Sequence, residues 1–73
     1  MTFDRMEQLK GLLITLNCAL VKFNKQTDIN RLDVLMNRLS LDYDTDDKIE
    51  SGCVRFINAH SDLIKRAFYP QEA

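Results

Sequence analysis

The fold is decided by residues 6–23, which read MEQLKGLLITLNCALVKF. Large apolar residues recur here at spacings of three, four, three, four and three, the pattern of a helix that packs along its whole length. A first helix is therefore predicted over about 4–25, with Thr2 or Asp4 as its N-cap. Its core face comprises Met6, Leu9, Leu13, Leu16, Leu20 and Phe23, widened by Leu12 and Ala19.

The same predicted helix carries a second, smaller apolar strip. Ile14 and Val21 lie more than about 100° from Leu9 at the helical rotation of about 100° per residue, and Cys18 lies farther round. A helix in a small bundle needs only one apolar face. We therefore predict that Ile14, Cys18 and Val21 form a partner-binding surface, either for another protein or for a second copy of the chain.

Two further helices are predicted from the remaining apolar patterns. One is expected over about 28–39, with Thr27 or Asp28 as its cap, and the other over about 47–68, closed by Pro70. Residues 40–47 are expected to form the main loop, and residues 71–73 a frayed tail. The second helix would bury Ile29, Leu32, Leu35, Met36 and Leu39. The third would bury Ile49, Cys53, Phe56, His60, Leu63 and Ala67, with Ile57, Ile64 and Phe68 beside them.

These helices predict an all-α fold in which residues 1–73 form a single helical domain. Two long antiparallel helices of about 20 residues, roughly 30 Å each, would be braced by a shorter middle helix. Only two glycines and one proline interrupt the chain, which favours helices throughout. A short middle helix could cover only part of the long seam, and this is a second reason to expect a partner.

The charge balance argues against nucleic acid as the partner. Ten Lys and Arg stand against eleven Asp and Glu, whereas proteins that bind phosphate backbones usually have a basic excess. One alternative stays open, namely a homodimeric helical regulator that binds nucleic acid. In such a dimer the basic cluster of Lys22, Lys25 and Arg31 would appear twice on one surface.

The hydropathy pattern predicts no membrane segment. The longest uncharged run covers residues 11–21, far short of the roughly 20 residues that a spanning helix needs. Acidic and basic residues precede this run in equal number, unlike the start of a secretory signal. Cys18 and Cys53 fall on different helix faces and are expected to be free thiols, so we predict a cytoplasmic location.

An acidic segment before the last predicted helix resembles the start of an EF-hand calcium loop, with Asp42, Asp44 and Asp46 at alternate positions. In that register Asp47 occupies the position of the essential glycine, and Cys53 that of the bidentate glutamate. Both substitutions remove features that calcium binding requires. No metal site is predicted, and the segment is interpreted as an acidic capping loop.

His60 is the only histidine, and it falls on the apolar face of the last predicted helix. We expect a half-buried ring that is hydrogen-bonded to a neighbour, with a phosphotransfer module using His60 as an alternative. The sequence has no glycine-rich phosphate loop, and neither cysteine has this histidine at helical spacing. We therefore predict no catalytic residues, no cofactor and no enzymatic activity. The expected function is that of a small adaptor, chaperone or inhibitor that packs helix against helix.

Overall fold

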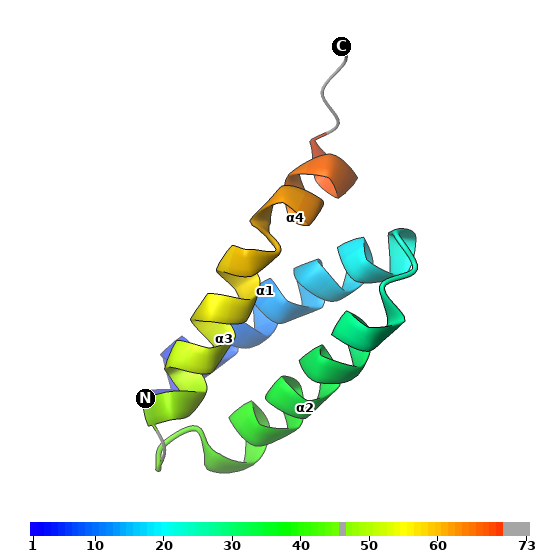
Figure 1. Cartoon of the computed structure of the whole chain (residues 1–73). Helices are drawn as coiled ribbons and strands as arrows, with labels where there is room; N and C mark the ends of the chain where they lie inside the picture. Colours follow the sequence, from blue (N-terminus) through cyan, green and yellow to red (C-terminus); the bar gives the residue numbers. More distant parts are fainter. Residues whose placement is uncertain (46, 70–73) are drawn as a thin grey trace.

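A computed structural model describes residues 1–45 and 47–69 and is all-helical over these residues. Its four helices are α1 (Phe3–Lys22), α2 (Gln26–Asp42), α3 (Asp47–Ala59) and α4 (Ser61–Phe68). In Figure 1, α2 runs back antiparallel to α1, and α3 then reverses direction again beside α2. The α4 helix continues beyond α3 toward the end of the molecule where α1 finishes. Helix α1 contacts each of the other three.

The predicted all-α fold is confirmed, but the predicted arrangement of three helices is wrong. The middle helix is not short, because α2 has 17 residues and nearly matches the 20 residues of α1. The expected long helix over 47–68 is divided into α3, with 13 residues, and α4, with 8. The long antiparallel pair is therefore α1 and α2. Pro70, predicted to close the last helix, and the predicted tail at 71–73 lie outside the described residues, as does Asp46.

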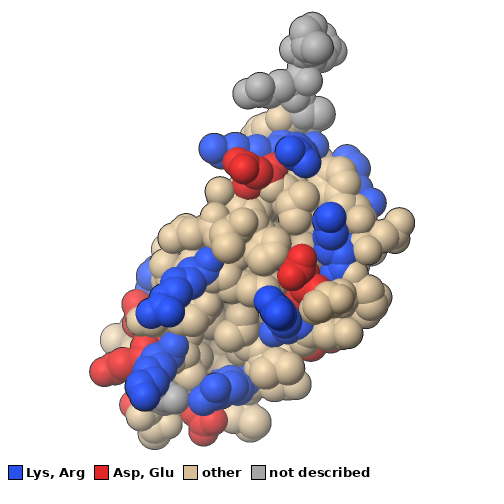
Figure 2. Space-filling model, viewed as in Figure 1, with Lys and Arg blue, Asp and Glu red and all other residues tan. Residues whose placement is uncertain are grey.

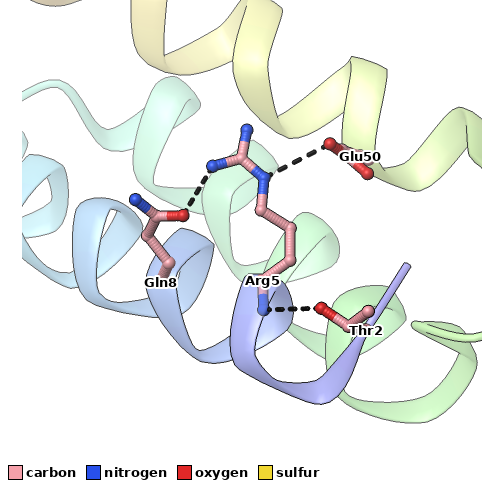
Figure 3. A network of polar contacts seen from close by, with 4 residues as sticks. All are labelled: Thr2, Arg5, Gln8 and Glu50. Atoms are coloured by element: carbon pink, nitrogen blue, oxygen red, sulfur yellow. Dashed lines mark hydrogen bonds and ion pairs between the residues drawn. The ribbon is translucent and has the colours of Figure 1, made fainter.

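Helix α1 begins and ends with local hydrogen bonds that its sequence provides. Thr2 is the N-cap, and its Oγ1 accepts a hydrogen bond from the Arg5 amide at 3.2 Å (Figure 3). The helix ends at Lys22 instead of residue 25 because Asn24 adopts a left-handed conformation with φ of 56°. The Asn24 amide donates to the Val21 carbonyl and the Lys25 amide to the Leu20 carbonyl, the pair of bonds that defines a Schellman C-cap.

Helix α2 extends beyond the predicted range of 28–39 at both ends. It begins after Lys25, so the predicted caps Thr27 and Asp28 both lie inside the first turn. It continues past Leu39 to Asp42, where Tyr43 packs against the core. The Tyr43 ring also meets Phe3 edge to face, with 6.0 Å between ring centroids. These contacts fasten the end of α2 to the start of α1, and they account for the additional helical turn.

The break between α3 and α4 falls at His60, and the histidine side chain bonds to the backbone at this point. In a continuous α-helix the His60 amide would donate to the Phe56 carbonyl; here it donates to the Ile57 carbonyl at 3.1 Å. The Phe56 carbonyl lies 2.8 Å from His60 Nδ1, which must donate because a carbonyl oxygen only accepts. The imidazole therefore occupies the carbonyl that the helix would have used.

The core follows the predicted seam of α1 closely. Two predicted core positions are wrong, because Leu12 is 42% exposed and Phe68 is 46% exposed. Phe68 is the last residue of α4, and Leu12 lies at the edge of the seam. Among the described residues the buried apolar set is Met6, Leu9, Leu13, Leu16, Ala19, Leu20, Leu32, Leu39, Ile49 and Cys53. The other predicted core residues are half-buried, including Phe23, Leu35, Phe56 and Leu63.

Polar contacts tie α1 to the second half of the chain. Arg5 Nε lies 3.2 Å from Glu50 Oε1 of α3, while Arg5 Nη1 donates to Gln8 Oε1 at 2.7 Å (Figure 3). At the other end Lys22 Nζ donates to the Ala67 carbonyl of α4 at 3.3 Å. Arg5 and Glu50 are more than one third exposed, so their pairing adds only about 0.2–1 kcal/mol. These contacts link α3 and α4 to α1, but they contribute little to the free energy of folding.

Candidate functional site

The residues predicted to bind a partner lie together on the solvent-facing side of α1. Ile14 is 54% exposed, Val21 is 56% exposed, and Cys18 between them is also exposed. Because they are spaced by four and three residues within one helix, they share one face. We call Ile14, Cys18 and Val21 the α1 strip. The packing of α2, α3 and α4 leaves this strip uncovered.

Ile14 also borders a shallow hollow between α1 and α2. The hollow has a volume of about 280 Å³, and its surface is partly apolar and partly polar. A side chain from a partner helix could insert here beside Ile14, with Asp33 and the asparagine amides available for hydrogen bonds. The hollow is lined by Ile14, Asn17, Leu32, Asp33, Met36 and Asn37.

The two cysteines differ in their chemistry. Both thiols are free; Cys18 is exposed on the α1 strip, whereas Cys53 is buried in the core beside α1 and α2. Burial raises the pKa of the Cys53 thiol, because the thiolate is poorly solvated there. Cys53 is therefore held as an unreactive thiol, and Cys18 is the cysteine that solvent can reach.

A second surface lies between α2 and α3 and was not predicted from the sequence. We call it the α2–α3 groove: an open, almost wholly apolar depression of about 510 Å³. Val34, which is 58% exposed, forms part of its wall. Figure 2 views this face, where Lys and Arg side chains border uncharged surface and some Asp and Glu side chains lie next to them. The groove is lined by Arg31, Val34, Leu35, Gly52, Arg55 and Phe56.

Sequence reasoning missed this groove because it treated each helix face separately. Leu35 and Phe56 were expected to be core residues, but both are only half-buried, and both line the groove. One signal was present in the sequence. Arg31 and Arg38 are seven residues apart on α2, and Lys48 and Arg55 are seven residues apart on α3, so each helix has a basic row on one face.

His60 is half-buried and hydrogen-bonded, as predicted. Its Nε2 lies 3.3 Å from Asp28 Oδ2 of α2, and its ring packs on Phe56 with 4.5 Å between ring centroids. Since Nδ1 donates to the Phe56 carbonyl, both ring nitrogens face oxygen atoms of the chain. This environment gives no support to the phosphotransfer alternative, which needs a ring nitrogen open to solvent. His60 instead joins α2 to the junction of α3 and α4.

The described residues were also searched for a metal site and for a membrane-spanning helix. Within residues 1–45 and 47–69, no three His, Cys, Asp or Glu side chains are grouped so that they could hold a metal ion. Asp46 of the acidic segment lies outside this range. No described helix is both long enough and apolar enough to cross a membrane.

Comparison of the chain with models of known protein families, with curated proteins and with solved structures finds no match. The proposals below therefore rest on the surfaces formed by the described residues. These surfaces are the α1 strip with the adjoining hollow, and the α2–α3 groove.

Proposed function

We propose that the chain is a non-enzymatic, cytoplasmic protein-interaction module. In this proposal the α1 strip packs against a helix of another protein or against a second copy of the chain. The observation that carries the proposal is the exposure of Ile14 and Val21, each more than half accessible, on a helix whose opposite face is fully buried. An adaptor, a chaperone or an inhibitor would each use such a surface, since all three act by covering or holding a partner.

The strength of the contact follows from the exposed area. Complete burial of an Ile or Val side chain contributes about 1.5–3 kcal/mol, so covering the exposed half of both contributes about 1.5–3 kcal/mol per chain. A symmetric pair of strips doubles this value. Association itself costs at least about 4 kcal/mol, so the strip alone supports only weak, concentration-dependent assembly. The hollow beside Ile14 and a complementary partner surface would supply the rest.

The alternative, a homodimeric regulator that binds nucleic acid, remains a prediction. Of its three proposed basic residues, Lys22 is hydrogen-bonded to the Ala67 carbonyl and Arg31 lines the α2–α3 groove. No structural observation specifically favours this alternative. It requires binding to DNA or RNA that weakens steeply as salt is raised, and no binding at low salt would exclude it.

The proposal is tested by replacing the strip and measuring the molar mass in solution. The Ile14→Asp/Val21→Asp variant puts charge into the proposed contact. The matched control is Leu41→Asp/Tyr69→Asp, which also puts two charges on exposed apolar residues, but outside both the α1 strip and the α2–α3 groove. Light scattering over a hundredfold concentration range should show assembly of the wild type and the control, and the single-chain mass for the strip variant. Circular dichroism should show the same helicity in all three.

If the wild type keeps the single-chain mass, the partner is a different protein, and the same three chains serve as bait in an extract of the native host. We expect proteins that the wild type and the control retain and that the strip variant loses. Retention of the same proteins by all three chains would contradict the proposal. Unfolding of the strip variant would show that Ile14 and Val21 belong to the internal core.

A further inference from the structure

The α2–α3 groove lies on the side of α2 that packs against α3, and the α1 strip plays no part in it. Its floor combines Leu35 of α2 with Gly52 and Phe56 of α3. The absence of a side chain at Gly52 gives the groove its depth, since a Cβ there would stand 3.8 Å from Leu35 Cδ2. The volume of about 510 Å³ has room for more than one large apolar side chain.

Positive charge flanks this apolar floor on both sides. Arg31 of α2 and Arg55 of α3 line the groove, and neither forms a hydrogen bond or an ion pair with another described residue. Both side chains are exposed. Arg38 and Lys48 continue the two rows at a spacing of seven residues. The groove therefore presents apolar contact area between two basic borders.

We propose that the α2–α3 groove binds an acidic amphipathic helix of a partner protein. Apolar residues of that helix would enter between Val34, Leu35 and Phe56, and Asp or Glu beside them would pair with Arg31 and Arg55. Arginine suits this role because its planar guanidinium forms two parallel hydrogen bonds with a carboxylate. The proposal adds a second binding surface to the module, and its test does not depend on the role of the α1 strip.

The shape of the groove favours a helix over a small molecule. Small-ligand sites enclose most of the ligand surface, whereas this groove is open to solvent. It also runs between two antiparallel helices, so a third helix laid over it would contact both (Figure 1). The apolar floor distinguishes it from a nucleic-acid surface, where phosphate contacts dominate and an apolar floor contributes little.

The test uses two synthetic peptides labelled with fluorescein, because the natural partner is unidentified. The acidic probe is a designed amphipathic helix with leucines along one face and glutamates on both sides of them. The basic probe has the same leucines and replaces every glutamate with lysine. Fluorescence anisotropy with the full chain should show binding of the acidic probe, and binding of the basic probe weaker by at least about tenfold, because like charges repel across the interface.

Three variants locate the binding. Arg31→Glu/Arg55→Glu should weaken the acidic probe by at least about tenfold and strengthen the basic probe, an exchange that loss of folding would not produce. Gly52→Leu should fill the groove and abolish binding of the acidic probe. Its matched control is Gly11→Leu, which makes the same change where a Cβ meets nothing within 4 Å. The control should bind the acidic probe as the wild type does.

Several outcomes would overturn the proposal. Equal affinity for the acidic and basic probes would show that the arginines do not select the ligand, and so would unchanged binding in the Arg31→Glu/Arg55→Glu variant. Failure of the wild type to bind the acidic probe, together with tight binding of a labelled DNA duplex, would assign the basic rows to nucleic acid. No probe binding, with a molar mass that falls in Gly52→Leu, would assign the groove to a second copy of the chain.

Discussion

The junction between α3 and α4 should depend on a coupled pair of side chains, His60 and Asp28. Replacing His60 with Ala removes the Nδ1 hydrogen bond to the Phe56 carbonyl and the contact of Nε2 with Asp28 Oδ2. It also removes the packing of the imidazole on the Phe56 ring. Replacing Asp28 with Ala removes only the contact with Nε2. The two changes therefore share one interaction, and the contacts within residues 56–60 are lost only with His60.

The structure sets the size of these effects. A part-buried hydrogen bond contributes about 1 kcal/mol, and the ring contact about 0.5–1 kcal/mol. The side chains of His60 and Asp28 are 16% and 28% exposed, so their pairing is better shielded than a surface pair and should contribute about 1 kcal/mol. We expect His60→Ala to lower the free energy of unfolding by about 2–3 kcal/mol and Asp28→Ala by about 1 kcal/mol.

Because Nδ1 donates to the Phe56 carbonyl, Nε2 can donate to the Asp28 carboxylate only when both ring nitrogens carry hydrogen, so this pairing requires the imidazolium. A double-mutant cycle measured by urea unfolding at one mildly acidic pH therefore tests it. The double variant should be no less stable than His60→Ala alone, because the shared contact is already lost. Asp33→Ala, which removes an exposed carboxylate from the same helix, is the matched control and should change stability little. Strictly additive single effects would refute the coupling. A neutral or stabilising His60→Ala would refute the role of the imidazole in the helix break.

Three further predictions concern local features of the chain. Asn24→Ala should lower the free energy of unfolding by about 1 kcal/mol, whereas Asn24→Gly should not, because glycine readily adopts the left-handed conformation. An equal loss of stability in both variants would contradict the Schellman cap. Gly11→Ala and Gly52→Ala should each raise the free energy of unfolding by up to about 1 kcal/mol, since neither new Cβ would clash with another atom. Thermal unfolding measures this, and a lower melting temperature in either variant would contradict it. Ellman's reagent near neutral pH should modify Cys18 rapidly and Cys53 slowly, because the raised pKa of Cys53 lowers the fraction of its thiolate form. Reaction of Cys53 should therefore need a higher pH. Equal reaction rates of the two thiols would contradict the burial of Cys53.

Much of the fold could be predicted from the periodicity of α1. Its seam from Met6 to Leu20 is buried as expected, and the all-α class follows from the scarcity of glycine and proline. Thr2, one of the two caps predicted for α1, is its N-cap, whereas the caps predicted for α2 were wrong. These features depend on residues within one or two turns of each other, and a single sequence displays such relationships directly.

The break at His60 could not be predicted in the same way. The apolar series continues unbroken from Ile49 to Ala67, so the pattern indicates one helix. The interruption depends on the imidazole binding the Phe56 carbonyl, while Asp28 from a distant part of the chain lies against its other nitrogen. Helix α2 is extended by another tertiary contact, the packing of Tyr43 against Phe3 and the core. Propensity along one segment contains no information about such partners.

The candidate surfaces divide in the same manner. The α1 strip was visible because it is a property of one helix, and the structure leaves Ile14 and Val21 exposed. The α2–α3 groove is a property of two helices and of the angle between them. The sequence shows a basic row on each of these helices, but Arg31 and Arg55 become neighbours of one apolar surface only after α3 folds back along α2.

The most direct test of the α1 strip is the alkylation rate of Cys18 in the unmodified chain, measured together with molar mass. Cys18 lies between Ile14 and Val21 on the exposed face, and buried Cys53 serves as an internal reference. If the strip forms the contact, Cys18 should react rapidly in the single chain and slow down in proportion to assembly, whether with a second copy or with a captured partner. An assembled chain whose Cys18 reacts as fast as in the single chain would contradict the claim, because the interface would then lie elsewhere.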